Sequence, residues 1–243
     1  MKLQFDRPTD RQYENGIEKV AIFPIQHGKY QNGIAWSGIT AVNERPSGAE
    51  PNPLYADNIK YLNLLSNEEF AATIEAYDYP KECGDCFGQS EIADGVYIGQ
   101  QNRKHFGLVY KTRCSDASNK SEYKLHILFN CLLSATEQNH TTVGDTPEAV
   151  VFSWELTADK HSIPNFKPSS SLVLDSEKLT KAGFYNLLKF FEDTLYGTDT
   201  TDPGFLSLKQ IVESIPKVIY LRDSGNDAIL DSYGNRIQSV VYE

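Results

Sequence analysis

The sequence predicts a mainly β protein with some α-helix, in which a half-buried sheet is followed by an amphipathic helix. Three observations support this fold class. Apolar and polar residues alternate through much of the first two thirds of the chain. The spacing of apolar residues becomes helical in the last third. Aromatic residues make up 12% and charged residues 23% of the 243 residues, a composition typical of a folded protein.

The alternation predicts paired strands at Phe106–Arg113 and Tyr123–Leu133, because only the polar loop Cys114–Glu122 separates them. A period of two places alternate residues on one face of a half-buried sheet. In the second strand that face should carry Tyr123, Leu125, Ile127, Phe129 and Cys131. The other predicted strands are Ile17–Ile25, Gly33–Glu44, Phe70–Tyr79 and Ala149–Ala158.

Helical spacing from Lys178 to Tyr196 predicts a single amphipathic helix over about residues 176–196. Asp175 or Ser176 can accept hydrogen bonds from its first amides, and Gly197 can end it.

A second, shorter helix should begin at Ser207, where Gln210 completes a capping box, and should stop before Pro216. We expect one β domain over residues 1–215. Residues 216–243 should form a C-terminal extension with short β-like runs at Val218–Leu221 and Ile237–Tyr242.

The segment Arg45–Asn58 contains three prolines and is predicted to project as an extended loop arm, being too Pro-rich for a tight hairpin turn. The segment Pro80–Gly99 is predicted to be irregular. The candidate contact residues of this arm are Arg45, Pro46, Glu50, Pro51, Pro53, Tyr55, Asp57 and Asn58.

The charge balance argues against a protein that grips nucleic acid. The chain has 23 Lys and Arg against 33 Asp and Glu, a formal net charge of −10. Tight phosphate binding needs a cationic face, whereas an acidic surface lets DNA pass without sticking. The densest basic patch should pair with carboxylates across a subunit contact or be solvated; it comprises Asn102, Arg103, Lys104, Lys111 and Arg113.

The pair Cys83-Gly-Asp-Cys86 is the clearest candidate for chemistry. Two thiolates at this spacing can bind zinc or cycle as a redox dithiol. Zinc needs two further ligands, and Cys114 and Cys131 are not spaced as a second knuckle. Incidental loop cysteines are the third interpretation, and no metal or cofactor is expected. Four cysteines are too few for a disulfide scaffold.

No catalytic motif is present, so an enzyme is not expected. The chain lacks a nucleophile elbow, a phosphate-binding loop and a dinucleotide fingerprint. The five histidines stand one per segment: His27, His105, His126, His140 and His161. No secretory signal peptide or transmembrane helix is expected, because no apolar run approaches the ~18 residues that span a bilayer.

Five blocks of sequence, in order, resemble the major tail proteins of siphophages and related prophages, the phage tail tube protein family. The resemblance covers roughly Gly16 to Asp202, and the helix ending at Gly197 fits it. The Cys83–Cys86 pair and the length of chain after Pro216 depart from the family pattern. The blocks are Ala49–Ser66, Phe70–Pro80, Gly99–Gly107, Tyr123–Ile127 and Asp145–Glu155.

The resemblance implies a tail-tube-type β-sandwich or barrel flanked by an α-helix, six copies of which form a ring whose inner sheets line a channel. In this picture the arm Arg45–Asn58 and the loop Pro80–Gly99 would contact neighbouring subunits or rings. Stacked rings would form the tail tube of the virion and conduct DNA into the host during ejection. The implied partners are further copies of the chain, a tape-measure protein in the lumen, tail terminator and distal tail or baseplate proteins, and double-stranded DNA in passage. Assembly would occur in the bacterial cytoplasm, without membrane insertion.

A β-sandwich binding module, such as an adhesin or a carbohydrate binder, is the alternative. It would use Trp36, Tyr77 or Tyr97 as a stacking platform and would form no tube.

Overall fold

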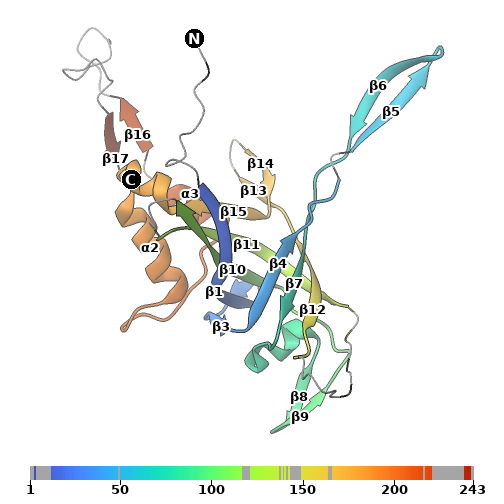
Figure 1. Cartoon of the computed structure of the whole chain (residues 1–243), viewed down its shortest axis with the longest axis vertical. Helices are drawn as coiled ribbons and strands as arrows, with labels where there is room; N and C mark the ends of the chain where they lie inside the picture. Colours follow the sequence, from blue (N-terminus) through green and yellow to red (C-terminus); the bar gives the residue numbers. More distant parts are fainter. Residues whose placement is uncertain are drawn as a thin grey trace. The chain divides into compact units, whose positions relative to one another are not determined.

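A computed structural model describes most of the chain, which divides into two compact units, Met1–Phe205 and Leu206–Glu243. The first unit holds the main sheet, and the second holds one helix and one strand pair (Figure 1). The extent of the predicted β domain, residues 1–215, stays a prediction. The described residues are 12–48, 50–116, 121–136, 149–163, 166–215, 217–220 and 238–241, with residues 3, 138, 140 and 142.

Nine strands form the main sheet of the first unit, and every pair within it is antiparallel. The order is β2-β1-β10-β11-β12-β7-β4, with β15 also paired to β11 and β3 to β1. This path is open at both ends, so the sheet folds as a sandwich and does not close into a barrel. The strands are β1 (Gln12–Gln26), β2 (Lys29–Tyr30), β3 (Ile34–Trp36), β4 (Ile39–Glu44), β7 (Phe70–Ala76), β10 (Phe106–Asp116), β11 (Ser121–Ala135), β12 (Phe152–Ala158) and β15 (Ser171–Asp175).

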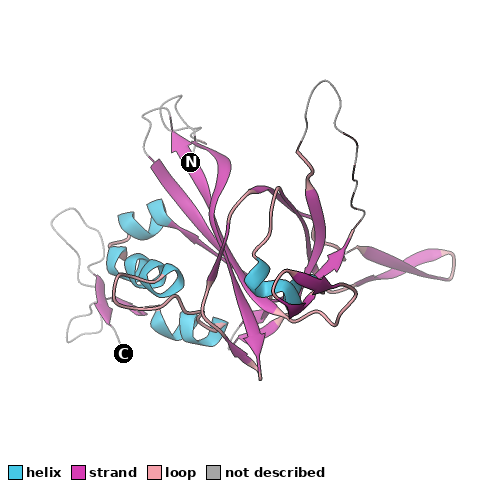
Figure 2. Cartoon of the chain, turned by 90° about the horizontal axis from the view of Figure 1, so that it is seen from below, coloured by secondary structure: helices cyan, strands magenta, loops and turns pink. Residues whose placement is uncertain are grey.

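Three further hairpins of this unit lie outside the main sheet, and in each the two strands pair only with one another (Figure 2). A short 3₁₀ segment, η2 (Lys81–Phe87), lies between β7 and the second of them. The hairpins are β5 (Pro51–Ala56) with β6 (Ile59–Leu65), β8 (Ser90–Ala93) with β9 (Val96–Ile98), and β13 (His161–Ile163) with β14 (Phe166–Ser169).

The sheet buries apolar residues on both faces. One face encloses the sandwich core, in which the rings of Trp36, Phe87 and Trp154 meet edge to face at centroid distances of 5.2 to 5.6 Å. Such contacts add to the free energy gained by removing apolar area from water. Helix α2 (Tyr185–Tyr196) is tied to the sheet from outside the core, because the Tyr196 hydroxyl donates to the carbonyl of Lys19 at 2.9 Å.

The predicted pairing of the strands around residues 106–113 and 123–133 is confirmed, and both strands are longer than expected. The face assignment of Cys131 is wrong. Leu108 lies opposite Leu128 but Phe106 lies opposite Cys131, so β11 contains one extra residue there. Asn130 takes a left-handed φ of 47° at this bulge. The bulge shifts the alternation by one residue and turns Cys131 into the sandwich core.

The predicted Gly33–Glu44 strand is two strands, β3 and β4, interrupted at Ser37 and Gly38. The single helix expected over residues 176–196 is likewise two, α1 (Ser176–Lys181) and α2. Gly183, between them, has φ +82°, a conformation that a helix cannot contain and that glycine adopts without strain. The predicted ends are right: the Asp175 carboxylate accepts the Lys178 amide at 3.0 Å, and α2 stops before Gly197.

In the second unit, α3 (Leu208–Ser214) begins with the predicted capping box of Ser207 and Gln210 and ends before Pro216. The two β-like runs of the tail form the antiparallel pair β16 (Lys217–Tyr220) and β17 (Gln238–Val241). The segment between these strands lies outside the described residues.

Candidate assembly interface

The arm is a β-hairpin, and the prediction of an extended loop is therefore wrong. Strands β5 and β6 pair along their whole length, from Pro51 opposite Leu65 to Ala56 opposite Ile59. Asp57 and Asn58 form the turn, with φ of 49° and 61°. Positive φ at both central residues is the geometry of the two-residue turn that matches strand twist.

Apolar side chains cover the arm but have nothing to pack on. Every residue of β6 is exposed, and the hairpin projects from the rest of its unit (Figure 1). A two-stranded hairpin alone in water is marginally stable, and a large exposed apolar surface marks a binding site. The arm therefore carries a candidate binding surface. Its exposed large apolar residues, 38% to 71% accessible, are Leu54, Tyr55, Ile59, Tyr61, Leu62, Leu64 and Leu65.

The root of the arm is fixed to the main sheet. The Arg45 guanidinium donates to the Thr73 hydroxyl at 2.6 Å and lies 3.5 Å from the Glu155 carboxylate. Beyond it, Ser47 bridges to Glu69, and each amide donates to the carbonyl of the other. A rigid root aims the arm in one direction.

The predicted contact residues divide accordingly. Arg45 and Pro46 belong to the root. Glu50 immediately precedes β5, and Ala49 lies outside the described residues. The remaining predicted residues lie on the hairpin itself and are exposed, except Pro53, which is half-buried: Pro51, Pro53, Tyr55, Asp57 and Asn58. Sequence analysis missed β6, although its alternation after the Asp57-Asn58 turn was a usable signal.

A second exposed hairpin, β8–β9, leaves the opposite end of the sheet. Phe152 lies opposite Ala76 and Ala158 opposite Phe70, so the end of β7 that leads to β8 is far from the end that receives the arm. The segment was predicted to be irregular. Its turn is Asp94-Gly95, a strong hairpin signal, and its exposed apolar residues are Ile92, Val96, Tyr97 and Ile98.

Cys83 and Cys86 form a disulfide within η2, which sequence analysis did not anticipate. Both residues are buried, at 3% and 0% exposure, and belong to the sandwich core. Bonded to each other, the sulfurs cannot act as thiolate ligands. Across the part of the chain that the structure describes, no group of three His, Cys, Asp or Glu side chains is placed to hold a metal. Cys114 and Cys131 are free thiols.

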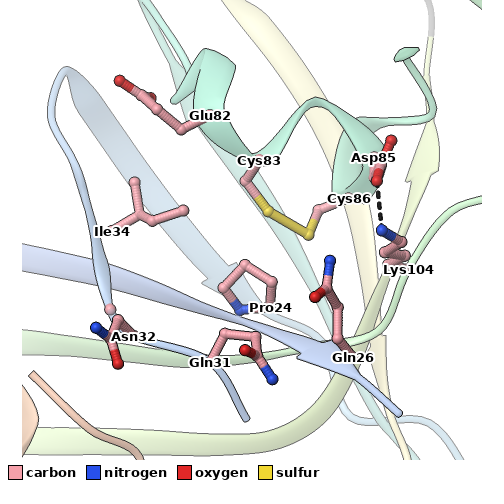
Figure 3. A pocket seen from close by; sticks show the side chains of 11 residues that line it. Pro24, Gln26, Gln31, Asn32, Ile34, Glu82, Cys83, Asp85, Cys86 and Lys104 are labelled. Atoms are coloured by element: carbon pink, nitrogen blue, oxygen red, sulfur yellow. Dashed lines mark ion pairs between the residues drawn. A yellow bond between two sulfur atoms is a disulfide. The ribbon is translucent and has the colours of Figure 1, made fainter. Parts of the chain in front are cut away.

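An open pocket of about 470 Å³ lies beside the disulfide (Figure 3). Gln26, Gln31 and Asn32 point into it from the segment around β1 and β2, while Asp85 and Lys104 pair at 2.5 Å at its edge. Its polar groups are these amides, the Asp85–Lys104 ion pair and the carboxylate of Glu82.

The basic patch does not form a stripe on the surface. Lys104 pairs with Asp85, Arg113 with Glu18, and Lys111 with Glu192 of α2, all within one chain. The prediction that the patch pairs across a subunit contact or is solvated is wrong for Lys111, which is buried, whereas the side chains of Lys104 and Arg113 are 39% and 60% exposed. Lys111 is 3% exposed and lies 4.1 Å from the ring centre of Tyr123, so it holds α2 against β10.

A polar cluster links strand β1 to strand β4 through side chains of β10 and β11. It consists of Glu14, Glu44, Tyr110 and His126. His126 stacks on Tyr110 with ring centroids 4.5 Å apart, and its nitrogens lie 3.6 Å from Glu14 and 3.8 Å from Glu44. The Tyr110 hydroxyl donates to Glu44. Burial lowers the pKa of His126, against the opposing effect of the two carboxylates. Burial and the bond to Glu44 raise the pKa of Tyr110.

Several edges of the sheet are unpaired among the described residues, including those of β4, β15 and the first half of β1. Strand β15 bonds to β11 on one side only, and its Val173 is 50% exposed. The first half of β1, before Val20, bonds only to β10. An unpaired edge presents free amides and carbonyls to a further strand.

Of the three aromatic residues considered as stacking platforms for a binding module, one is buried and two are exposed. Trp36 is 2% exposed, and its indole N–H donates to the carbonyl of Asp78. Tyr77 and Tyr97 are exposed, but on different elements. No helix within the described residues is long and apolar enough to span a membrane.

No protein family and no curated protein matches the chain. Among solved structures, the chain is similar to part of the 6-fold symmetrised cryo-EM structure of the anti-feeding prophage baseplate. That similarity has 10% sequence identity and a TM-score of 0.34, and it covers 72% of this chain and 97% of the other. At this identity and TM-score the similarity supports no statement about function, which must be argued from the chain's own residues.

Proposed function

We propose that the chain is a structural, non-enzymatic virion subunit that assembles with copies of itself. The arm carries this proposal. A fifteen-residue hairpin from Pro51 to Leu65 has a fixed root and exposes seven large apolar side chains. This exposed apolar surface lowers solubility unless a partner covers it. In a self-assembling subunit that partner is another copy.

The finer proposal is the tail tube of a bacteriophage, in which six copies close into a ring and rings stack into a conduit for DNA. The ordered blocks that resemble major tail proteins support it. The unpaired edges of β15 and β1 support ring closure by strand pairing between neighbouring copies. The arm then reaches from one copy to another, in its own ring or the next.

The net charge of −10 suits a conduit, because an acidic or neutral wall repels the phosphate backbone and offers no tight binding site. In this role the lumen holds a tape-measure protein during assembly and passes double-stranded DNA during ejection. Tail terminator and distal tail or baseplate proteins cap the two ends of the tube. The subunit is made in the host cytoplasm and needs no cofactor.

The test is assembly of the purified chain with and without the arm. Wild-type protein, concentrated stepwise and followed by sedimentation velocity and negative-stain microscopy, is expected to form rings and tubes. A variant in which a Gly-Ser linker replaces residues 51–65 is expected to keep the circular dichroism spectrum of the remaining fold and to lose tube growth. Tyr185→Ser, which removes an exposed aromatic from α2, is the matched control and should assemble.

Two outcomes contradict the proposal. A wild-type chain that stays monomeric at every concentration, also after incubation with a tape-measure segment, removes the conduit and favours the binding module. Normal tubes from the variant without the arm leave self-assembly standing and remove the arm from it.

A further inference from the structure

A groove of about 570 Å³ lies at the root of the arm, between the end of β6 and the β13–β14 hairpin. Leu65, Phe70 and Pro168 give it an apolar floor. Its volume falls in the range that proteins use to enclose a ligand or a few side chains.

Two lysines give the groove a local positive charge on an acidic chain. Lys160 and Lys167 line it, against one carboxylate, Glu68. Within the described residues neither lysine is in an ion pair, although most cations of the main sheet are paired. The groove is therefore complementary to an apolar segment that carries a negative charge.

The β8–β9 hairpin has these properties. It exposes Ile92, Val96, Tyr97 and Ile98, and its tip carries Asp94, which has no ion-pair partner among the described residues. The second tip carboxylate, Glu91, accepts the Gly95 amide at 3.0 Å and so keeps the turn closed. Apolar sides with an acidic tip complement an apolar floor with basic walls.

The hairpin and the groove belong to opposite ends of the sheet. Groove residues follow the ends of β6 and β12, whereas the hairpin follows the other end of β7. A chain cannot therefore join its own hairpin to its own groove. Two complementary patches at opposite ends of a subunit create a head-to-tail contact that repeats from copy to copy.

We propose that the β8–β9 hairpin of one copy docks into the groove of the next copy, with its Asp94 beside Lys160 and Lys167 of the receiving copy. This contact rests on the proposed assembly and specifies its axial step. The arm leaves the sheet at the same end as the groove. Both contacts therefore cross the same boundary between successive copies, and together they set the polarity of the tube.

Disulfide trapping tests the contact directly. In a Cys114→Ser background, which removes the half-buried free thiol, a chain carrying both Asp94→Cys and Lys167→Cys is oxidised at concentrations at which the wild type assembles. We expect a ladder of covalent dimers, trimers and larger species, because two cysteines link only when their backbones come within disulfide range. Mixing the two single-cysteine variants should give dimers and no higher species.

Two further double-cysteine variants test the specificity of the ladder and whether another segment occupies the groove. Lys81→Cys places the second cysteine at the same end as β8–β9, so its combination with Asp94→Cys should give no ladder. Asp57→Cys with Lys167→Cys reports on the arm tip. A ladder from that pair, with none from Asp94→Cys and Lys167→Cys, assigns the groove to the arm of a neighbouring copy and overturns the proposed contact.

Charge reversal supplies an independent measurement. Lys160→Glu with Lys167→Glu, or Asp94→Lys alone, should raise the critical concentration for tube growth by at least about tenfold, because like charges then face one another. The three substitutions together should restore growth. Tubes without an Asp94–Lys167 ladder overturn this contact and leave the tail-tube function intact. No assemblies from the wild-type chain, together with no ladder from the double-cysteine variant, overturn both.

Discussion

The arm hairpin and the β10–β11 pair are built from similar residues but have opposite surroundings. Both are antiparallel and rich in leucine, isoleucine and tyrosine. From Phe106 to Lys111 the residues of β10 are all buried, whereas those of β6 from Ile59 to Leu65 are all exposed. The difference lies in what covers the strand. For β10 the chain supplies the cover itself, and for the arm we propose that another copy supplies it.

This contrast separates residues that stabilise the fold from residues that stabilise an assembly. Burying a large apolar side chain is worth roughly 1.5–3 kcal/mol. For Leu108 or Phe106 this free energy is released when the chain folds. For Tyr61 or Leu65 it is released only when a partner covers the arm, so its loss should not change the stability of the monomer.

The largest expected effects come from one substitution in the core and one in the arm, each measured for its effect on folding and on assembly. Phe106→Ala should lower the free energy of unfolding by about 3–5 kcal/mol, because it opens a cavity in the sandwich core. Tyr61→Ala should change it by less than about 0.5 kcal/mol, since the side chain is 70% exposed, yet should impair tube growth. Urea unfolding of dilute protein and light scattering of concentrated protein measure the two effects. A large loss of stability in Tyr61→Ala would place the arm in the fold of the monomer.

The second prediction concerns Lys111 of β10, which forms an ion pair with Glu192 of α2. Glu192→Gln should lower the free energy of unfolding by roughly 2–3 kcal/mol, because it leaves a buried ammonium without its carboxylate. Lys111→Met should cost less, since Glu192 is 30% exposed and can be solvated while the methionine fills the site. Chemical denaturation of both variants gives the order. Equal losses would mean that the charge pair contributes through packing alone.

The sequence predicted well those features of the fold that depend on local signals. The capping box at Ser207, the cap at Asp175 and the pairing of β10 with β11 depend on residues a few positions apart. The break at Gly183 was missed because a single glycine is tolerated in a helical pattern. The bulge at Asn130 was missed because one extra residue changes the phase of a strand without changing its composition.

The candidate interface was predicted in part. The prolines of Arg45–Asn58 correctly marked a projecting segment, but they outweighed the Asp57-Asn58 turn, so the second strand of the arm was missed. The disulfide and the groove were not predicted. The groove joins Phe70 to Lys160 and Lys167, which are distant in sequence and come together only when β7 pairs with β12.

A third prediction tests whether the end of the sandwich near β8–β9 is held by its disulfide. Cys83→Ala with Cys86→Ala should lower the free energy of unfolding by about 2 kcal/mol, the chain-entropy value for a loop this short. The effect should fall on the fold and not on the arm, so tube growth at low temperature should persist. Thermal unfolding and microscopy measure the two. Intact-mass analysis after alkylation without reductant provides the control, because only Cys114 should react readily.

The smallest expected effect is the pH dependence that His126 gives to the fold. Its pKa is lowered by burial, although Glu44 and Glu14 oppose the shift. The unfolded chain therefore binds a proton at higher pH than the folded chain does, and stability falls as the pH drops from the ordinary histidine value through the lowered one. The pKa of Glu14 is also lowered: burial alone would raise it, but hydrogen bonds from Lys124 and Thr112 outweigh that, so its contribution is lost only in a more acidic window.

His126→Gln should remove the loss of stability in the upper of these two windows, because glutamine occupies the site beside Thr112 without titrating. His161→Gln, on the exposed strand β13, is the matched control for exchanging a histidine for glutamine. Unfolding free energies of dilute protein across the acidic range supply the measurement. Since the substitution leaves the arm hairpin, residues 51–65, unchanged, the same variant should polymerise normally at neutral pH. Failed assembly there, with an unchanged fold, would mean that the ends of β1 and β4 take part in the ring contact.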